Sequence, residues 1–304
     1  MENLNCNICP RNCNINRESS QGFCLNNNKI KISKVMIHKF EEPCLVGFCD
    51  CASDNPGSGA IFFSGCNLKC IYCQNYEISQ VKHGKEVSIE TLISLFKQLE
   101  NKGVLNINLV TPTHFTNQII EALKIYKPKV PVVWNSSGYE KAETIEKLNG
   151  LVDIFLIDFK YFSNSLAMEF SNAKDYLENV QKVLLTCKKI CPFDRFDSNG
   201  HLKRGLIVRH LCLPNCTNDS KKIISWVNDN IGNQTIFSLM SQYVPMFKAF
   251  TNDKINRKLK PLEYKILVNY LNSLNFKNAY IQDFESQSTE YTPDFNNELN
   301  DFIY

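Results

Sequence analysis

Apolar and polar positions follow two different periods along most of this 304-residue chain. Short, almost wholly apolar runs are typical of strands that are covered on both faces, and a recurrence every three to four positions is typical of helices. The predicted strands are residues 60–63, 105–110, 130–134, 152–159, 206–213 and 235–239, with a short one at 279–283. The predicted helices are residues 88–99, 119–125, 142–148, 165–190, 223–227 and 261–274.

The order of these segments predicts an α/β fold. Six strand–helix units in succession favour parallel strands joined by right-handed crossovers. A closed barrel of eight units needs two more units than this chain has room for, so we expect a partial (β/α)6 barrel of the TIM type. A doubly wound open sheet is the alternative, because the spacing of the segments does not separate an open sheet from a curved one.

The pattern also divides the chain into three parts. Residues 1–55 show little regular periodicity and predict an irregular cysteine-rich lobe tied together by metal. Residues 56–284 carry the barrel. Residues 285–304 contain acidic residues but no lysine or arginine, which predicts a mobile acidic extension.

The charge and the polar N-terminus exclude several classes of protein. The net charge is only +3, with basic and acidic residues interspersed, so we expect no nucleic-acid partner. Lysine-rich stretches at 29–39 and 254–260 are expected to be solvated faces. No signal peptide and no apolar run near the roughly 18 residues of a membrane helix is visible. We therefore expect a cytoplasmic protein without a membrane partner, whose 14 cysteines act as ligands rather than as disulfides.

Cys66, Cys70 and Cys73 form the main chemical signal, a C-x3-C-x2-C loop directly after the strand at 60–63. A [4Fe–4S] cluster normally takes four thiolates, so three cysteines leave one iron open to a chelating small molecule. The C-terminal end of a strand is where α/β folds place their active sites. A structural zinc loop that recruits a fourth cysteine is the alternative, and it leads to a non-enzymatic zinc-binding scaffold.

The loop and its neighbours resemble a known family. The C-x3-C-x2-C spacing resembles the signature of the radical S-adenosylmethionine (SAM) superfamily. Further stretches resemble the PflX-type proteins, relatives of pyruvate formate-lyase activating enzyme. These stretches are Glu41-Glu42-Pro43, residues 62–68, 73–75 and 108–114, Asp158-Phe159-Lys160-Tyr161, residues 204–210 and residues 240–243.

The resemblance implies a function and partners. A reduced [4Fe–4S] cluster would cleave SAM to a 5′-deoxyadenosyl radical, which abstracts hydrogen from a substrate. A one-electron donor such as flavodoxin or ferredoxin would reduce the cluster, and a glycyl-radical enzyme would be the activated partner. Modification of a small molecule or a peptide is the alternative.

The resemblance also implies which residues bind SAM. Most of the candidates stand at the C-terminal ends of the predicted strands, and Asp158 and Lys160 match an Asp-x-Lys of the activating enzymes. Relatives often carry a glycine-rich segment where Thr111 and Thr113 stand, so this chain departs from the pattern there. The candidate SAM contacts are Tyr72, Gln74, Thr111, Thr113, Asn135, Asp158, Lys160, Arg209 and Gln242.

The remaining cysteines fall into three groups. Cys6, Cys9, Cys13 and Cys24 have the spacing of a second metal site, for zinc or for a second iron–sulfur cluster. Cys44, Cys49 and Cys51 either complete an auxiliary cluster or are ordinary reduced thiols. Packing is the expected role of Cys187, Cys191, Cys212 and Cys216, and His114 and His210 are expected to be hydrogen-bonded structural residues.

Overall fold

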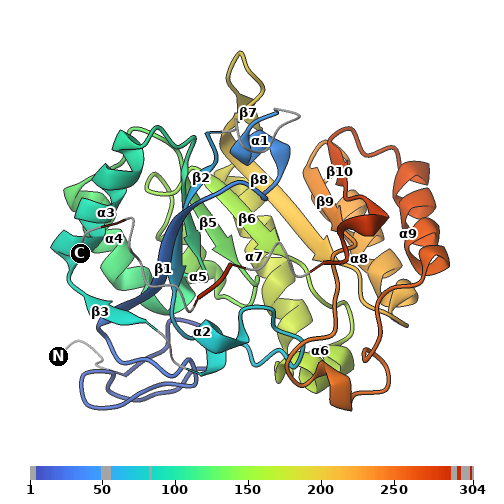
Figure 1. Ribbon diagram of the computed structural model, residues 1–304, viewed down its shortest axis with the longest axis horizontal. Helices are drawn as coiled ribbons and strands as arrows, with labels where there is room; N and C mark the ends of the chain where they lie inside the picture. Colours follow the sequence, from blue (N-terminus) through green and yellow to red (C-terminus); the bar gives the residue numbers. More distant parts are fainter. Residues whose placement is uncertain (1–4, 49–55, 82–83, 289–292, 296–301, 303–304) are drawn as a thin grey trace.

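The chain folds around one curved sheet of mainly parallel strands (Figure 1). A computed structural model describes residues 5–48, 56–81, 84–288, 293–295 and 302. Seven strands run parallel in the order β10-β9-β8-β6-β5-β4-β2. They are β2 (Ser58–Phe63), β4 (Ile107–Val110), β5 (Val132–Ser136), β6 (Ile154–Asp158), β8 (Leu202–Leu211), β9 (Ile236–Met240) and β10 (Ala279–Ile281). All seven lie where the sequence predicts strands, and the partial barrel is confirmed.

Helices cover the outside of the curved sheet (Figure 1). They are α3 (Ile89–Asn101), α4 (Thr116–Ile125), α5 (Ala142–Glu146), α6 (Asn164–Ser171), α7 (Tyr176–Ile190), α8 (Thr217–Asn230) and α9 (Pro261–Ser273). Ser88 caps α3, accepting a hydrogen bond from the Thr91 backbone N–H at 3.2 Å. The predicted helix over 165–190 is two helices, because Asn172 adopts a left-handed φ of 54° and ends α6. Among the described residues, no helix is long and apolar enough to cross a membrane.

Residues 30–38 correct the prediction of an irregular N-terminal segment. They form β1 (Ile30–His38), which pairs antiparallel with β2, and the short β3 (Lys85–Val87) pairs with β1 in turn. The structure therefore places this stretch in the barrel sheet. A second antiparallel addition, β7 (Arg195–Phe196), pairs with the start of β8 and forms the hairpin at the top of Figure 1.

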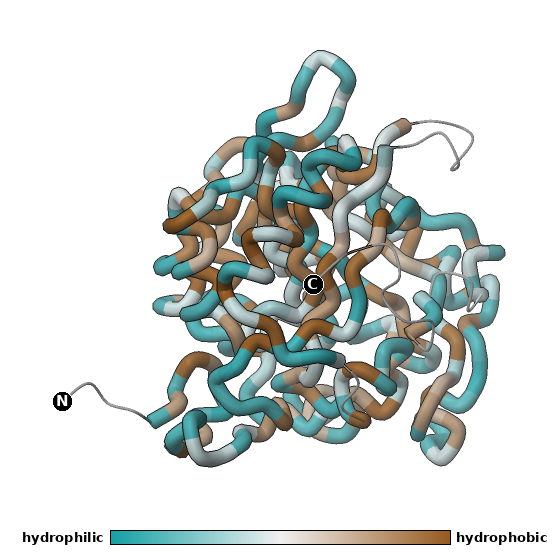
Figure 2. Tube along the Cα trace, turned by 60° about the vertical axis from the view of Figure 1, so that its left-hand side comes forward, coloured by the Kyte–Doolittle hydropathy of each residue, from teal (hydrophilic) through white to brown (hydrophobic). Residues whose placement is uncertain are grey.

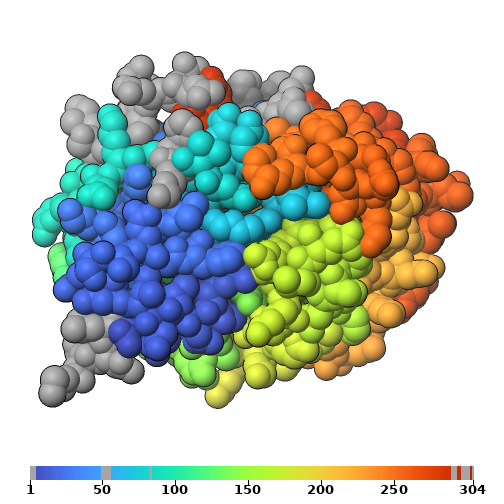
Figure 3. Space-filling model, turned by 90° about the horizontal axis from the view of Figure 1, so that it is seen from below, coloured from blue at the N-terminus to red at the C-terminus, as the bar shows by residue number. Residues whose placement is uncertain are grey.

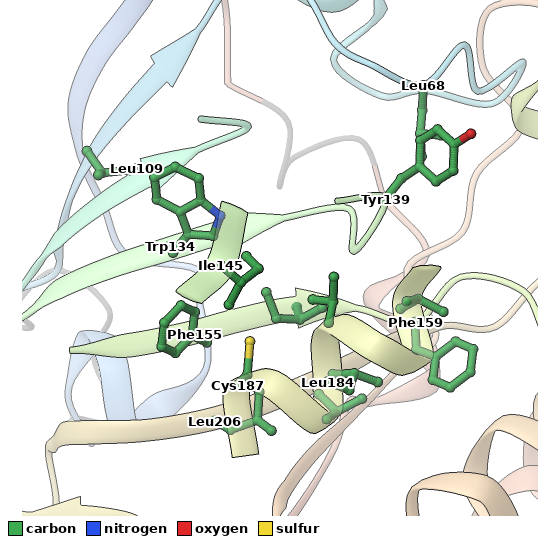
Figure 4. Packing of buried hydrophobic residues seen from close by; sticks show 14 of the residues in the cluster. Leu68, Leu109, Trp134, Tyr139, Ile145, Phe155, Phe159, Leu184, Cys187 and Leu206 are labelled. Atoms are coloured by element: carbon green, nitrogen blue, oxygen red, sulfur yellow. The ribbon is translucent and has the colours of Figure 1, made fainter. Parts of the chain in front are cut away.

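The layer between sheet and helices is apolar. Trp134 of β5, Phe155 of β6 and Leu206 of β8 are buried there, and Cys187 of α7 packs among them (Figure 4). Along the chain trace, many apolar segments lie in the interior, whereas the projecting hairpin is largely polar (Figure 2). Cys191, Cys212 and Cys216 are likewise buried, in agreement with their predicted packing role.

The inside of the barrel is closed at one end by α1 (Pro43–Val46). Cys44 and Leu45 of this helix are buried against Val133, Leu156 and Ile207 from the inner face of the sheet. Because side chains two positions apart share one face of a strand, the next inward residues are polar. They are Asn135, Asp158 and Arg209, at the C-terminal ends of β5, β6 and β8.

Part of the acidic C-terminal segment lies against the body. The Phe295 ring packs edge-on to Phe62 of β2, with centroids 5.6 Å apart, and Phe302 is buried in the main core. The described residues of this segment therefore contact the barrel.

Candidate active site

The cysteine loop follows β2 directly and is held from three directions. The backbone N–H groups of Lys69 and Ile71 donate to the carbonyls of Ser171 (3.1 Å) and Phe170 (2.8 Å) at the end of α6. The Ile71 carbonyl accepts from Lys248 N–H at 2.9 Å. Seen from below, four parts of the chain meet on one face (Figure 3). They are the N-terminal lobe (blue), the cysteine loop (cyan), the α6 region (yellow-green) and the segment near residue 250 (orange). The loop is thus fixed by segments far apart in the sequence.

Cys66, Cys70 and Cys73 are free thiols, and all three are partly exposed. Burial raises the pKa of Cys66 to about 12 and that of Cys73 to about 11, and in both cases the neighbouring Cys70 adds to the rise. The three sulfurs therefore lie within electrostatic reach of one another. As they stand, no three Cys, His, Asp or Glu side chains in the described chain are gathered closely enough to hold a metal ion.

A chain of hydroxyl groups ends on one of these sulfurs. Ser171 Oγ donates to Cys70 Sγ at 2.9 Å. Behind it, the Tyr161 hydroxyl lies 2.6 Å from Ser171 Oγ and 2.5 Å from the Tyr72 hydroxyl. Since Ser171 uses its proton on the sulfur, Tyr161 donates to Ser171 and Tyr72 donates to Tyr161.

A cavity of about 210 Å³ opens beside the loop, at the C-terminal ends of the parallel strands. Cys70 and Cys73 form part of its wall. The sequence-predicted residues among its lining are Tyr72, Gln74, Asn135, Asp158, Lys160, Arg209 and Gln242. Seven candidate SAM contacts from five segments of the chain are therefore brought to one cavity.

Arg209 is the centre of a buried polar network in this cavity. Its Nε donates to Asp158 Oδ1 at 2.7 Å, and its Nη1 donates to Glu41 Oε2 at 3.0 Å. Its Nη2 donates to Asn135 Oδ1 at 2.9 Å. An arginine in an apolar strand needs buried anions, and here it has two.

Lys160 completes the charge balance. Its Nζ lies 2.7 Å from Asp158 Oδ2, and both side chains are less than one-fifth exposed, so the pair lies inside the cavity rather than on the outer surface. Burial acts to raise the pKa of Asp158, but Arg209 and Lys160 outweigh it and lower that pKa to about 2. Asp158 is therefore ionised near neutral pH and orients both cations.

Thr111 and Thr113 are not brought to the cavity wall. Thr113 is buried and donates to Glu140 Oε1 at 2.8 Å, together with Trp134 Nε1 at 3.0 Å. Thr111 has a φ of +58°, a conformation that favours glycine, at the place where relatives often carry a glycine-rich segment. Thr113 therefore uses its hydroxyl group within the protein, on Glu140, and not in the cavity where SAM binding is expected.

The two histidines singled out in the sequence have structural partners. His114 Nε2 lies 2.7 Å from the Ser64 carbonyl. His210 contacts the Phe159 carbonyl through Nδ1 (2.7 Å) and Ser220 Oγ through Nε2 (2.9 Å). Both are buried, in agreement with the structural role that the sequence indicates.

Glu41 is a charged cavity residue that the site prediction missed. Its Oε1 accepts from Asn108 Nδ2 at 3.0 Å, and its Oε2 pairs with Arg209. Burial raises the pKa of Glu41, and Arg209 opposes this rise. The only signal in the sequence was the Glu41-Glu42-Pro43 stretch within the family resemblance.

Comparison with known proteins decides the family. The model of the radical SAM superfamily matches residues 60–195, which include the cysteine loop and strands β2, β4, β5 and β6. The chain belongs to the radical SAM superfamily. It is 32% identical over 271 residues to an uncharacterized protein of Methanocaldococcus jannaschii, MJ0674, a match that covers 84% of this chain and 70% of the relative.

Two further comparisons are more distant. A putative glycyl-radical enzyme activating enzyme of the same organism, MJ1227, is 28% identical over 137 residues, or 44% of this chain and 55% of the relative. The fold is similar to that of methylornithine synthase (PylB), with a TM-score of 0.51 and 12% identity over 71% of this chain. The match covers 62% of the synthase chain, less than two thirds of its length.

The residues present fit the two cofactors of this superfamily, a [4Fe–4S] cluster and SAM. Three free thiols stand at the end of β2, and two of them face the cavity. The same cavity holds the Asp158 carboxylate, the Lys160 ammonium group and the Arg209 guanidinium, which are chemically suited to the amino and carboxylate groups of an amino acid. Because thiols must lose their protons to bind a metal, cluster loading would release protons here.

Proposed function

We propose that this protein binds a [4Fe–4S] cluster at Cys66, Cys70 and Cys73 and SAM in the adjoining cavity, and uses the two to start radical chemistry. The observation that carries the proposal is the single cavity shared by Cys70, Cys73, Asp158, Lys160 and Arg209. When bound and reduced, the cluster supplies the electron that cleaves SAM to methionine and a 5′-deoxyadenosyl radical, which abstracts hydrogen from a substrate carbon.

The protein's own residues would bind and orient SAM. Lys160 offers an ammonium group to the SAM carboxylate, and Asp158 offers a carboxylate to its amino group. Tyr72 and Gln74 belong to the cluster loop, so they would lie near the adenosine. The cavity walls would keep water away from the radical.

We further propose that the hydrogen comes from a glycine of a partner enzyme, so that this protein is an activating enzyme. The likeness to the putative activating enzyme MJ1227 supports this substrate, and so does the motif resemblance to pyruvate formate-lyase activating enzyme. A flavodoxin or ferredoxin would supply the electron. A partial barrel suits a polypeptide substrate because its sheet is not closed.

The test is anaerobic reconstitution with iron and sulfide, followed by reduction with dithionite in the presence of SAM. We expect 5′-deoxyadenosine by chromatography, and its loss in Cys66→Ala, Cys70→Ala or Cys73→Ala. Cys212→Ala, which changes a buried cysteine away from the loop, is the matched control and should keep the product. A full cluster without 5′-deoxyadenosine, even with added partner, would contradict the proposal.

The substrate is tested separately. With a glycyl-radical enzyme of the pyruvate formate-lyase type added, electron paramagnetic resonance should show a glycyl radical in the partner. If SAM is cleaved but no protein radical forms, the substrate is a small molecule or a peptide, and only the activating role is wrong.

A further inference from the structure

The N-terminal segment 5–27 has no apolar core of its own. Its side chains that are less than 9% exposed are two cysteines, an arginine and an asparagine: Cys9, Arg17, Cys24 and Asn26. Backbone hydrogen bonds nevertheless fold it into tight turns, with Cys6 N–H donating to Ile15 O at 2.8 Å and Asn14 N–H donating to Cys6 O at 3.0 Å. A segment this short needs another source of order, and metal is a common one.

The four cysteines of this segment lie near one another. A Cβ atom added to Gly22 would lie 3.4 Å from Cys13 Sγ and 3.6 Å from Cys24 Sγ, so these two sulfurs flank the same glycine. The Phe23 backbone N–H donates to Cys13 Sγ at 3.4 Å, a contact typical of metal-bound thiolates. Cys9 interacts electrostatically with Cys13 and Cys24, and Cys24 interacts with Cys6 and Cys13.

Two cations beside these cysteines lack an anion. Lys69 Nζ and Arg11 Nη2 are buried atoms without a hydrogen-bond partner among the described residues. Both groups lie over the Phe23 ring, at 5.3 Å and 3.8 Å from its centroid. Unpaired buried cations are unfavourable. Four thiolates around a zinc ion, or around an iron–sulfur cluster, carry a net negative charge that would compensate them.

The segment also touches the catalytic loop directly. Asn26 Nδ2 donates to Cys24 O at 3.0 Å and to Ser64 O at 2.8 Å. Gly65, with a φ of +79°, leaves no room for a side chain, because an added Cβ would lie 2.2 Å from Cys24 O. On the other side of Cys66, Arg11 Nε donates to Asn67 O at 2.7 Å.

We propose that Cys6, Cys9, Cys13 and Cys24 bind a second metal centre through four thiolates, and that this centre fixes the catalytic loop on both sides of Cys66. The shared chemistry is a thiophilic metal, present either as Zn²⁺ or as an iron–sulfur cluster. In the described structure the sulfurs of these cysteines are not close enough together to coordinate one metal ion. The same holds for Cys66, Cys70 and Cys73, the family's cluster ligands, so the separation does not speak against a site.

The test uses the full chain with Cys66→Ala, Cys70→Ala and Cys73→Ala combined, purified without oxygen, which removes the catalytic cluster. We expect this variant to retain about one zinc ion and no colour, or about four iron and four sulfide with absorbance near 400 nm. Adding Cys13→Ser should remove that metal, whereas adding Cys212→Ser should not. A triple variant with neither zinc nor iron would overturn the proposal.

A second measurement needs no variant. In the metal-loaded wild-type protein, Cys6 and Cys13 should resist alkylation, although both are partly exposed, and mass spectrometry should show at least tenfold faster labelling after chelation. Equal rates before and after would overturn the site.

The effect on the catalytic loop is tested by Cys13→Ser alone. It should at least halve the iron held at the catalytic cluster, and full retention of that iron would overturn the coupling. Neither metal assay depends on SAM cleavage, so the proposed function can fail while this site stands.

Discussion

Arg209 Nη1 lies 3.0 Å from Glu41 Oε2, and this ion pair joins β8 to the turn that follows β1, 168 residues away in the sequence. The same guanidinium contacts Asp158 on the neighbouring strand β6. Asp158 and Arg209 are directly paired in the register of the sheet. One cation therefore holds two carboxylates inside the barrel. Removing it would leave both without their main counter-charge.

Arg209→Met should destabilise the fold strongly. It keeps a long side chain but leaves two buried carboxylates, a change that typically costs about 3–5 kcal/mol. The measurement is the free energy of unfolding in urea. Lys127→Met is the control, since its pair with Asp153 is more exposed and should contribute below about 1 kcal/mol. Equal effects of the two substitutions would contradict this account of Arg209.

Lys160→Met should weaken SAM binding without disturbing the cluster. Lys160 lines the cavity and is held by Asp158 at 2.7 Å, so its charge is fixed where an anionic group can meet it. We expect the Kd for SAM, measured by anaerobic calorimetry, to rise about tenfold, which is about 1.4 kcal/mol. Iron content should not change. Lys203→Met, which breaks a pair with Asp197 near β7, should leave the Kd unaltered, and a wild-type Kd for Lys160→Met would exclude Lys160 as a SAM contact.

Thr113→Val should lower the stability of the fold but leave SAM binding unchanged. Thr113 donates to the buried Glu140, so the substitution leaves that carboxyl with one donor fewer, at a cost of about 1–3 kcal/mol. Because Thr113 lies off the cavity wall, the Kd for SAM should stay within about twofold of wild type. A tenfold rise in the Kd with unchanged stability would restore Thr113 to the SAM site.

The parallel strands follow from local rules of the sequence, whereas most of the cavity residues are predicted by the family resemblance. Apolar runs mark the strands, and Asp158 and Lys160 stand at the end of one, where α/β folds place function. The sequence pattern misses β1 because Lys31 and Lys34 interrupt the apolar pattern of residues 30–38 and indicate a solvated surface instead. It misses Glu41 because that residue lies in a turn, and only folding brings it to Arg209.

The contacts of the C-terminal segment and the roles of Cys44, Cys49 and Cys51 likewise do not follow from the sequence pattern. Acidic composition alone predicts a mobile extension, but it does not indicate that Phe295 packs on Phe62. Cys44 is buried inside the barrel, in agreement with an ordinary thiol. Cys49 and Cys51 lie outside the described residues, so their role stays a prediction.

His210→Gln should reduce the acid sensitivity of the fold. Burial is the main reason that the pKa of His210 falls to about 4, so the native state keeps it neutral while the unfolded chain binds a proton below about pH 6.5. The stability that neutral His210 contributes is complete above pH 6.5 and is lost as the pH falls toward 4, by about 1.4 kcal/mol per pH unit. Urea midpoints between pH 5 and 7.5 should fall less steeply in the variant than in wild type. An identical slope would show that His210 is not the group responsible.

Ser171→Ala should lower the reduction potential of the cluster. Ser171 Oγ donates to Cys70 Sγ at 2.9 Å, and a hydrogen bond to a ligand sulfur favours the more negative, reduced state. The backbone bond from Lys69 N–H to Ser171 O does not involve the side chain, so the loop should keep its place and its iron. A redox titration followed by electron paramagnetic resonance measures the potential. Ser220→Ala, which removes a buried hydroxyl bonded to His210 rather than to a cysteine, should leave the potential where it is. If both variants shift it equally, general loosening of the barrel is the cause, and the hydroxyl chain through Tyr72, Tyr161 and Ser171 does not tune the cluster.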